Sequence, residues 1–300
     1  MGGTVAASLR ALYITLRHAA IPLQVVIEDD CVGGGLSAMN ISALYIVPPQ
    51  ITSAAAEGLS DWVRTGGGRV VSVAGGGLLD ERNQTNKAMH SLLGLSTAGL
   101  FTGNKSAFND TIWFCKQDLA YATMLDRVTL TDASVDQKPL SAKGHKLIID
   151  KFEAPKESVS SRVLGRFEDG TVAAAAIEFP AAGRAVFMAF PVGFAYFDPA
   201  MPKRPVDRGS TDQNYNHFLP TDFDVGARRL AIAPIADLDA VRPVVPSDAL
   251  VEAGIIAHDS KPDKVLVLVN WRGGPVQNLT LTLGPSVVPE LSSMRLSRTS

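Results

Sequence analysis

The chain has 300 residues, of which 46% are hydrophobic and 19% charged, with a formal net charge of −2 and a pI near 6.2. This composition predicts a globular protein with a packed core, organised as one large domain or two. The nearly neutral charge gives no electrostatic reason to expect nucleic acid or an anionic membrane as a partner. No apolar run approaches the roughly 18 to 20 residues that span a bilayer, and residues 1–20 lack the pattern of a signal peptide.

Cysteine and histidine usage indicates no metal site. Two cysteines, Cys31 and Cys115, are too few for a disulfide scaffold or a cysteine-rich zinc site. The five histidines, at positions 18, 90, 145, 217 and 258, show no spacing typical of metal ligands. We therefore expect no cofactor. Four N-x-S/T sequons occur, but such short motifs arise by chance and leave the compartment open.

The first predicted element is a helix near the N-terminus. Leu9, Leu12, Tyr13 and Leu16 recur at intervals of three and four residues, which places them on one helical face. Thr4 is the expected N-cap of this helix. We expect this face to point into the core.

Two strands and a second helix are predicted next. The segment PLQVVIEDD (22–30) predicts a short strand, and SALYIVPPQ (42–50) predicts another that stops at its two prolines. The segment TSAAAEGLSDWVRTGGG (52–68) predicts a helix that buries Trp62 and ends at Gly66 as its left-handed C-terminal residue.

The middle of the chain alternates strands and helices and then becomes rich in strands. A buried strand is predicted at 69–73 and a helix at 83–95, and this alternation indicates a parallel, doubly wound sheet. Between 101 and 197 the β-like runs are separated by turns, so we expect hairpins added to that sheet. These runs are RVTLTD (127–132), HKLIID (145–150), SRVLGRF (161–167), TVAAAAIEF (171–179) and RAVFMAF (184–190).

The C-terminal part is predicted to form a second, smaller domain. A polar loop at 198–224 and a helix at 225–238 complete the first domain. The later runs LVEAGIIA, KVLVLVNW and NLTLTL predict strands of a small antiparallel unit. We place the boundary near 240, which gives an α/β domain over 1–240 and a small β-domain over 241–300.

The run ALYIVPPQITSAAAEGLSDWVRTGGGRVVSVAGGGLLDE (43–81) resembles the class I glutamine-amidotransferase-like domain of glycoside hydrolase family 42 β-galactosidases, usually called the trimerisation domain. Segments 163–197, 247–256 and 264–283 extend the resemblance over most of the chain. It implies a flavodoxin-like sheet followed by a small β-sandwich, a homo-oligomer, specifically a trimer, and a galactoside-type carbohydrate as ligand. In that family both domains follow a barrel that carries the catalytic glutamates. No such barrel is present in these residues, so those glutamates have no matching positions here.

The stretch GGGRVVSVAGGG (66–77) ends a strand in a glycine-rich turn, as in enzymes that present a nucleophile there. Active glutamine amidotransferases place a cysteine at this turn, where turn amides can activate a thiolate and hold an oxyanion. The matching position is Ala74, which has no nucleophile. The resemblance therefore implies a vacant nucleophile position and a non-catalytic accessory region. The resembling domain also begins with a strand before its first helix, so we expect this chain to be a fragment or a truncated product.

Other chemically suggestive residues have simpler interpretations. Three acids precede Cys31 and should raise its thiol pKa, which argues against a displaced nucleophile. The glycine runs match no phosphate-binding motif. Glu168 and Asp169 are predicted to form a hairpin turn with Gly170, and sequence neighbours do not establish the facing carboxylates of a glycosidase. Trp271, which ends a predicted strand, is left open as a sugar platform.

The segment 204–224 is the strongest candidate for ligand binding, because loops carry binding function and planar polar groups suit sugars. The alternative is a solvated linker in which Arg and Asp pair with one another. The rival functions are thus a carbohydrate-binding module that uses this loop, or an amidotransferase-like or peptidase-like hydrolase with another nucleophile. The candidate residues are Arg204, Asp207, Arg208, Asp212, Asn214, Tyr215, Asn216, His217, Asp222 and Asp224.

Overall fold

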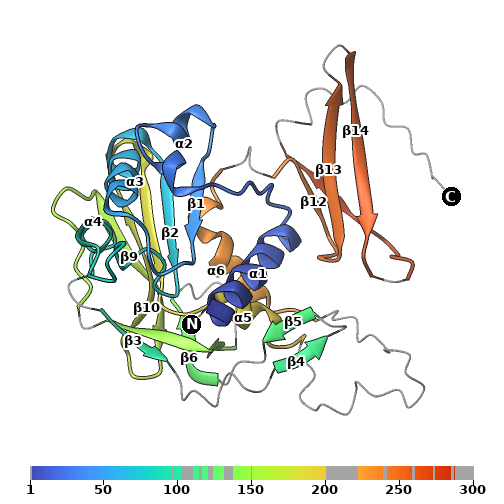
Figure 1. The fold of residues 1–300 in the computed structure, drawn as a ribbon. Coiled ribbons are helices and arrows are strands. Elements are labelled where there is room, and N and C mark those ends of the chain that lie inside the picture. The colour runs from blue at the N-terminus through green and yellow to red at the C-terminus, as the bar shows by residue number, and fades with distance from the viewer. Residues whose placement is uncertain are drawn as a thin grey trace. The chain divides into compact units, whose positions relative to one another are not determined.

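The computed structural model divides the chain into two compact units (Figure 1). Unit 1 comprises Met1–Thr15 and Gln24–Pro234, and unit 2 comprises Leu16–Leu23 and Ile235–Ser300. The boundary expected near 240 stays a prediction. The structure describes residues 2–95, 98–102, 111–114, 117–120, 124–131, 138–149, 151–200, 222–238, 242–258, 261–272, 274–284 and 287.

The helices and strands of the structure are labelled as in Figure 1, and the helices are given first. The helices are α1 (Gly2–His18), α2 (Gly35–Ala38), α3 (Ser53–Gly66), α4 (Lys87–Leu92), α5 (Val192–Phe197) and α6 (Val225–Ile232), with 3₁₀ helices η1 (Glu28–Cys31), η3 (Pro180–Ala182) and η5 (Ala233–Ile235). The strands are β1 (Ala43–Ile46), β2 (Arg69–Val73), β3 (Ala98–Thr102), β4 (Thr111–Phe114), β5 (Gln117–Ala120), β6 (Met124–Leu130), β7 (Leu140–Lys143), β8 (His145–Ile149), β9 (Ser160–Phe167), β10 (Val172–Glu178), β11 (Arg184–Met188), β12 (Val244–Pro246), β13 (Val251–His258), β14 (Lys261–Asn270) and β15 (Leu281–Leu283).

Unit 1 is built on a seven-stranded mixed sheet of order β1-β2-β11-β10-β9-β6-β7. The first three strands are parallel, and the remaining pairs are antiparallel. Strand β11 joins the two parts, because it pairs in parallel with β2 and antiparallel with β10. Helices α3 and α4 lie on one side of the sheet and α5 and α6 on the other (Figure 1). The predicted α/β fold class is confirmed. Four of the expected β-like runs form β6, β9, β10 and β11 of this sheet, but HKLIID (145–150) forms β8, which pairs with β3 in a separate two-stranded sheet.

The core of unit 1 lies along the central strands. All five residues of β2 are buried, and Ala173 to Ile177 of β10 are at most 1% exposed. A strand covered on both faces must be apolar on both sides, which is why the pattern does not alternate. The strands predicted at 69–73 and in the hairpin region are confirmed with shifts of at most three residues at their ends, the largest at β6, which begins at Met124.

Helix α1 buries a different face from the one predicted. Leu12 and Leu16 are buried, but Leu9 and Tyr13 are 48% and 51% exposed. The helix instead packs closely against Gly193, where an added Cβ would lie 2.6 Å from the Leu12 amide nitrogen. Because the helix backbone lies so close to Gly193, small residues such as Ala11 must face the core. The buried face of the helix is therefore shifted by one position from the predicted one.

Two further details of α1 complete this correction. The hydroxyl of buried Thr15 donates to the carbonyl of Ala11 (2.7 Å), so its burial leaves no unpaired donor. The helix begins at Gly2, so Thr4 lies inside it and is not its N-cap.

The strand predicted at 22–30 is wrong. Residues 22–27 have no regular structure, and η1 follows at Glu28–Cys31. Val25 and Ile27 are 88% and 62% exposed. The segment is apolar enough for a strand but pairs with none in the part of the chain that the structure describes.

Three predicted helix boundaries also need correction. Gly66 is the last residue of α3, and the left-handed residue is Gly67 at φ 70°, one position later. The helix predicted at 83–95 covers only Lys87–Leu92, because Asn86 caps it by accepting from the Met89 amide (3.4 Å). The helix predicted at 225–238 ends at Ile232 and continues as η5.

Unit 2 contains two small antiparallel sheets. Strand β12 pairs with β15, and β13 pairs with β14, so the predicted antiparallel strands are confirmed. Arg17 joins this unit through its Nη2 atom, 3.1 Å from Oε2 of Glu252. No described helix is long and apolar enough to span a membrane.

Candidate functional site

The turn that follows β2 has the backbone conformation that the glycine run suggests. Ala74 adopts φ 56°, a left-handed conformation that is uncommon outside glycine and costs roughly 1 kcal/mol or more. Its amide still donates to Met188 of β11 at 2.7 Å, so the strained residue directly continues the sheet. Ala74 is 6% exposed, and its methyl group is the only side chain at the bend.

Close approach to β1 requires glycine at position 76, and positive φ angles favour glycine at positions 75 and 77. A Cβ added at Gly76 would lie 2.0 Å from the carbonyl oxygen of Ile46, which no side chain can tolerate. Gly75 and Gly77 adopt φ 90° and 76°. The Ser72 hydroxyl donates to the Gly76 carbonyl at 2.7 Å and is buried, so it closes the turn and is not presented as a nucleophile.

A buried imidazole lies directly beside this turn. Nε2 of His145, at the start of β8, is 3.2 Å from the Ala74 carbonyl oxygen. Burial lowers the His145 pKa, and the hydrogen bond to Ala74 only partly offsets that effect. Since a carbonyl only accepts, the neutral ring must carry its proton on Nε2. His145 therefore braces the main chain of the turn.

The spacing of the histidines indicates no metal site at His145, and its position beside Ala74 was not predicted. The available clue is its place between Gly144 at φ 82° and Lys146, in a tight connection from β7 to β8. A histidine in so tight a connection has a restricted backbone, but its hydrogen-bond partner, Ala74, lies 71 residues away in the sequence and could not be identified from this clue.

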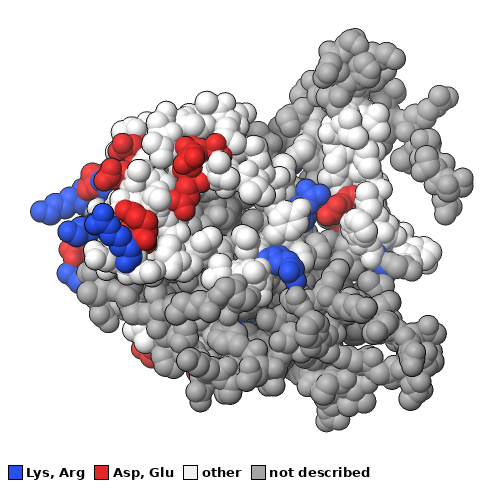
Figure 2. All heavy atoms as spheres, viewed as in Figure 1, with Lys and Arg blue, Asp and Glu red and all other residues white. Residues whose placement is uncertain are grey.

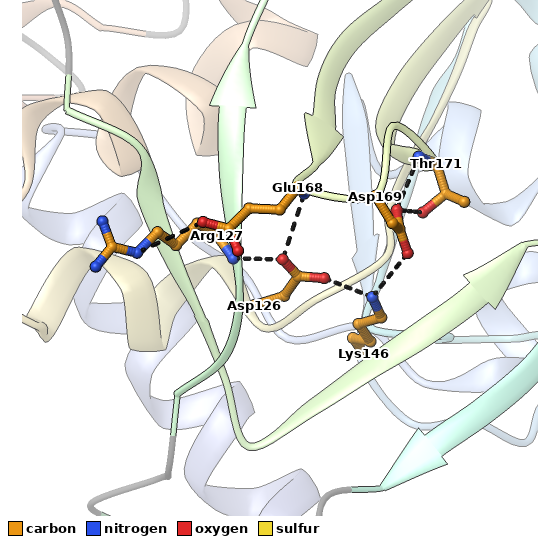
Figure 3. Close-up of polar contacts among 6 residues, drawn as sticks. All are labelled: Asp126, Arg127, Lys146, Glu168, Asp169 and Thr171. Carbon is orange, nitrogen blue, oxygen red and sulfur yellow. Dashed lines mark hydrogen bonds and ion pairs between the residues drawn. The ribbon is translucent and has the colours of Figure 1, made fainter.

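A second polar cluster links β6, β8 and the turn between β9 and β10 (Figure 3). Lys146 of β8 lies with its Nζ atom 2.5 Å from Oδ2 of Asp126 on β6 and 3.5 Å from Oδ2 of Asp169. The same Nζ is 4.4 Å from the centroid of the Phe167 ring. Burial alone would lower the Lys146 pKa, but the hydrogen bond and charge of Asp126, with help from Asp169, raise it overall.

The carboxylates of this cluster are engaged in fixing the β9–β10 turn. Asp126 Oδ1 accepts from the amides of Arg127 (2.7 Å) and Glu168 (3.3 Å). Asp169 accepts from the amide and hydroxyl of Thr171, and these bonds lower its pKa. The predicted hairpin turn is confirmed. The cluster thus acts as a structural joint between β6, β8 and the turn.

Most of the loop predicted to bind ligand lies outside the described residues. This holds for Arg204, Asp207, Arg208, Asp212, Asn214, Tyr215, Asn216 and His217. Asp222 is exposed, and Asp224 caps α6 by accepting from the Ala227 amide at 2.8 Å. The Phe223 ring stacks on Tyr196 with centroids 4.9 Å apart. Phe223 and Asp224, at the end of the predicted loop, are therefore held in place by α5 and α6. The role of the loop in ligand binding stays a prediction.

The remaining candidates occupy ordinary positions. Cys31 is buried, and its pKa is raised to about 11 by burial first and then by the charges of Asp30 and Glu28. The thiol is therefore protonated near neutral pH, as the sequence predicted. Trp62 is 8% exposed and belongs to the core, whereas Trp271 is 58% exposed. Cys115 lies outside the described residues.

Charge is mixed on the visible surface. In Figure 2, acidic and basic side chains lie close together over the region of α3 and α4 and form no face of one sign. Among the described residues, no three His, Cys, Asp or Glu side chains lie where they could hold a metal ion.

Comparison with known proteins shows a shared fold. The chain matches a β-galactosidase from Bacillus circulans sp. alkalophilus (TM-score 0.57, 12% identity, 88% of this chain and 31% of that one). It also matches one from Rahnella sp. R3 (0.56, 12%, 88% and 32%) and a catalytic mutant of Gan42B, a GH42 β-galactosidase from G. stearothermophilus (0.51, 13%, 83% and 28%). The chain thus spans about a third of their length. No family model matches the chain, and no curated protein matches it.

Proposed function

We propose that this chain is a non-catalytic accessory region of a β-galactosidase-like glycoside hydrolase, and that it supports oligomerisation as the trimerisation-type domain does in that family. The observation that carries the proposal is the turn at Ala74. A left-handed, buried residue ends a central parallel strand, and it has no nucleophile. The fold shared with β-galactosidases gives this turn its family context.

Two of the described carboxylates, Asp126 and Asp169, are not arranged as a glycosidase pair, which agrees with the proposal. A glycosidase needs two carboxyl groups that face each other across a bond, about 5 to 9.5 Å apart. Asp126 and Asp169 are instead bound to Lys146 and to main-chain amides. We also propose that the sheet is flavodoxin-like and related to that of glutamine amidotransferases. In this interpretation Ala74 occupies the position of their nucleophile.

The proposal is tested by incubating the purified chain with a chromogenic nitrophenyl β-galactoside and, separately, with glutamine. We expect colour release and ammonia release that match buffer. Turnover of the galactoside that is abolished by Glu168→Gln, a change at a side chain 68% exposed, would contradict the proposal. Saturable binding of galactose without turnover would instead favour the carbohydrate-binding module.

A further inference from the structure

Three N-x-S/T sequons lie in the described part of the chain, at Asn40, Asn83 and Asn278. The structure describes five asparagines, and serine and threonine make up about one residue in eight of the sequence, so chance would place fewer than one sequon among the five. All three sequon asparagines are exposed and left-handed, with φ of 56°, 58° and 56°. The other two described asparagines, Asn86 and Asn270, are not left-handed. The described sequons therefore share one setting, an exposed bend of the backbone.

The turn that contains Asn83 is short and held by main-chain hydrogen bonds. The Asn83 amide donates to the Asp80 carbonyl at 3.1 Å, and the Asp80 amide donates to the Gln84 carbonyl at 2.8 Å. Asp80 also accepts from the Gln84 amide through Oδ1 at 2.8 Å. Leu79 and Thr85 form an antiparallel bridge across the base of the turn. The turn therefore holds the exposed Asn83 at a fixed place on the surface of unit 1.

The carboxamide of Asn83 has its nitrogen available for reaction. Oδ1 of Asn83 accepts from Nε2 of Gln50 at 2.8 Å, and Nδ2 has no hydrogen bond to any residue that the structure describes. Thr85, the hydroxyl residue of this sequon, is exposed, as are Glu81 and Arg82. An asparagine-linked glycan is bulky and solvated, so its acceptor must face water among polar neighbours. The turn at Asn83 meets these requirements.

We propose that Asn83 is an acceptor for an N-linked oligosaccharide, transferred from a lipid-pyrophosphate-linked donor. Nδ2 of Asn83 loses a proton to solvent and forms a bond to C1 of the first sugar. The bond between C1 and the donor pyrophosphate breaks, and the lipid pyrophosphate leaves with its electron pair. Because this motif is modified in secreted proteins, the proposal requires export of the chain, directed by sequence other than residues 1–20. It does not depend on the proposed accessory function.

Site mapping on protein recovered from the cells that make it tests the proposal. Peptide N-glycosidase in heavy-oxygen water converts a glycosylated asparagine to an aspartate with one heavy oxygen atom, and trypsin in ordinary water then releases residues 83–87. This peptide contains both Asn83 and Asn86. We expect the label at Asn83 and none at Asn86, which is buried, lies outside any sequon and reports spontaneous deamidation. Asn83 that is unlabelled, or labelled equally without the glycosidase, would overturn the proposal.

A pair of variants separates the sequon from the asparagine itself. The full chain is made with a cleavable leader in secretory cells and mapped in the same way. Thr85→Ala removes the hydroxyl that the sequon requires and leaves Asn83 in place, whereas Thr85→Ser keeps a hydroxyl and is the matched control. We expect loss of the label at Asn83 in Thr85→Ala alone, with unchanged unfolding midpoints because Thr85 is exposed. A label that persists in Thr85→Ala, or that is absent from the wild type, would contradict the proposal.

Discussion

Strand β10 at the centre of the sheet in unit 1 and residues 22–27, which precede η1, are both apolar but have different surroundings. Strand β10 lies between β9 and β11, and Ala173 to Ile177 are almost fully buried. Residues 22–27 are also apolar, yet no described strand pairs with them, and Val25 is 88% exposed. Strand propensity is largely a measure of how well side chains fit between neighbours. The difference shows that an apolar run becomes a strand only where a second strand satisfies its backbone.

The turn at 74–77 contacts β11 through the Ala74 amide and lies against β1 at Gly76, and we expect a single added carbon to destabilise the fold most at this turn. Gly76→Ala places a Cβ 2.0 Å from the Ile46 carbonyl, so either β1 or the turn must move. We expect the free energy of unfolding to fall by about 3 kcal/mol or more in urea titrations.

Gly75→Ala is the matched control for the turn. Its added Cβ meets only Leu147 and Leu78 side chains at 3.8 and 3.9 Å, but its φ of 90° is strained for alanine. We expect a loss of about 1 to 2 kcal/mol. Equal losses at the two glycines would show that backbone conformation, and not the contact with β1, dominates.

The central strands were predicted correctly and the strand at 22–30 wrongly, and both results have the same physical cause. Strands at 69–73 and 171–179 are apolar, bounded by turn residues and paired within the chain, so local pattern and final structure agree. The buried face of α1 was misjudged because it depends on Gly193, far along the chain. His145 beside Ala74 and Lys146 beside Asp126 were missed for the same reason, since neither pairing leaves a periodic signal.

Substitution of Lys146 tests the antiparallel part of the sheet, which lies at the end away from β1. Lys146→Met leaves Asp126, 10% exposed, without its cation, so we expect a loss of about 2 kcal/mol in the free energy of unfolding. The raised Lys146 pKa means that this stabilisation is present below the ordinary lysine pKa and is lost as pH rises through the folded value. Chemical unfolding at neutral and alkaline pH measures both effects.

Asp169→Asn serves as the control for the ion-pair cluster. Asp169 is 54% exposed, and asparagine keeps an oxygen for the Thr171 bonds. We expect a loss of no more than about 0.5 kcal/mol. If Lys146→Met lowered the free energy of unfolding no more than this control, the cluster would contribute little to stability. Other contacts would then hold β6, β8 and the hairpin together.

The smallest expected effect has the opposite sign and concerns Ala74 itself. Glycine adopts φ 56° without the steric cost that alanine pays, so Ala74→Gly should raise the free energy of unfolding by up to about 1 kcal/mol. Ala173→Gly is the control, because Ala173 is fully buried within β10, where glycine should cost about 1 kcal/mol. Differential scanning calorimetry of both variants would show the two midpoints moving in opposite directions. A loss at both positions would mean that packing of the Ala74 methyl outweighs its backbone strain. The residue would then be retained for its contacts in the core, and the left-handed turn would no longer support a vacated nucleophile position.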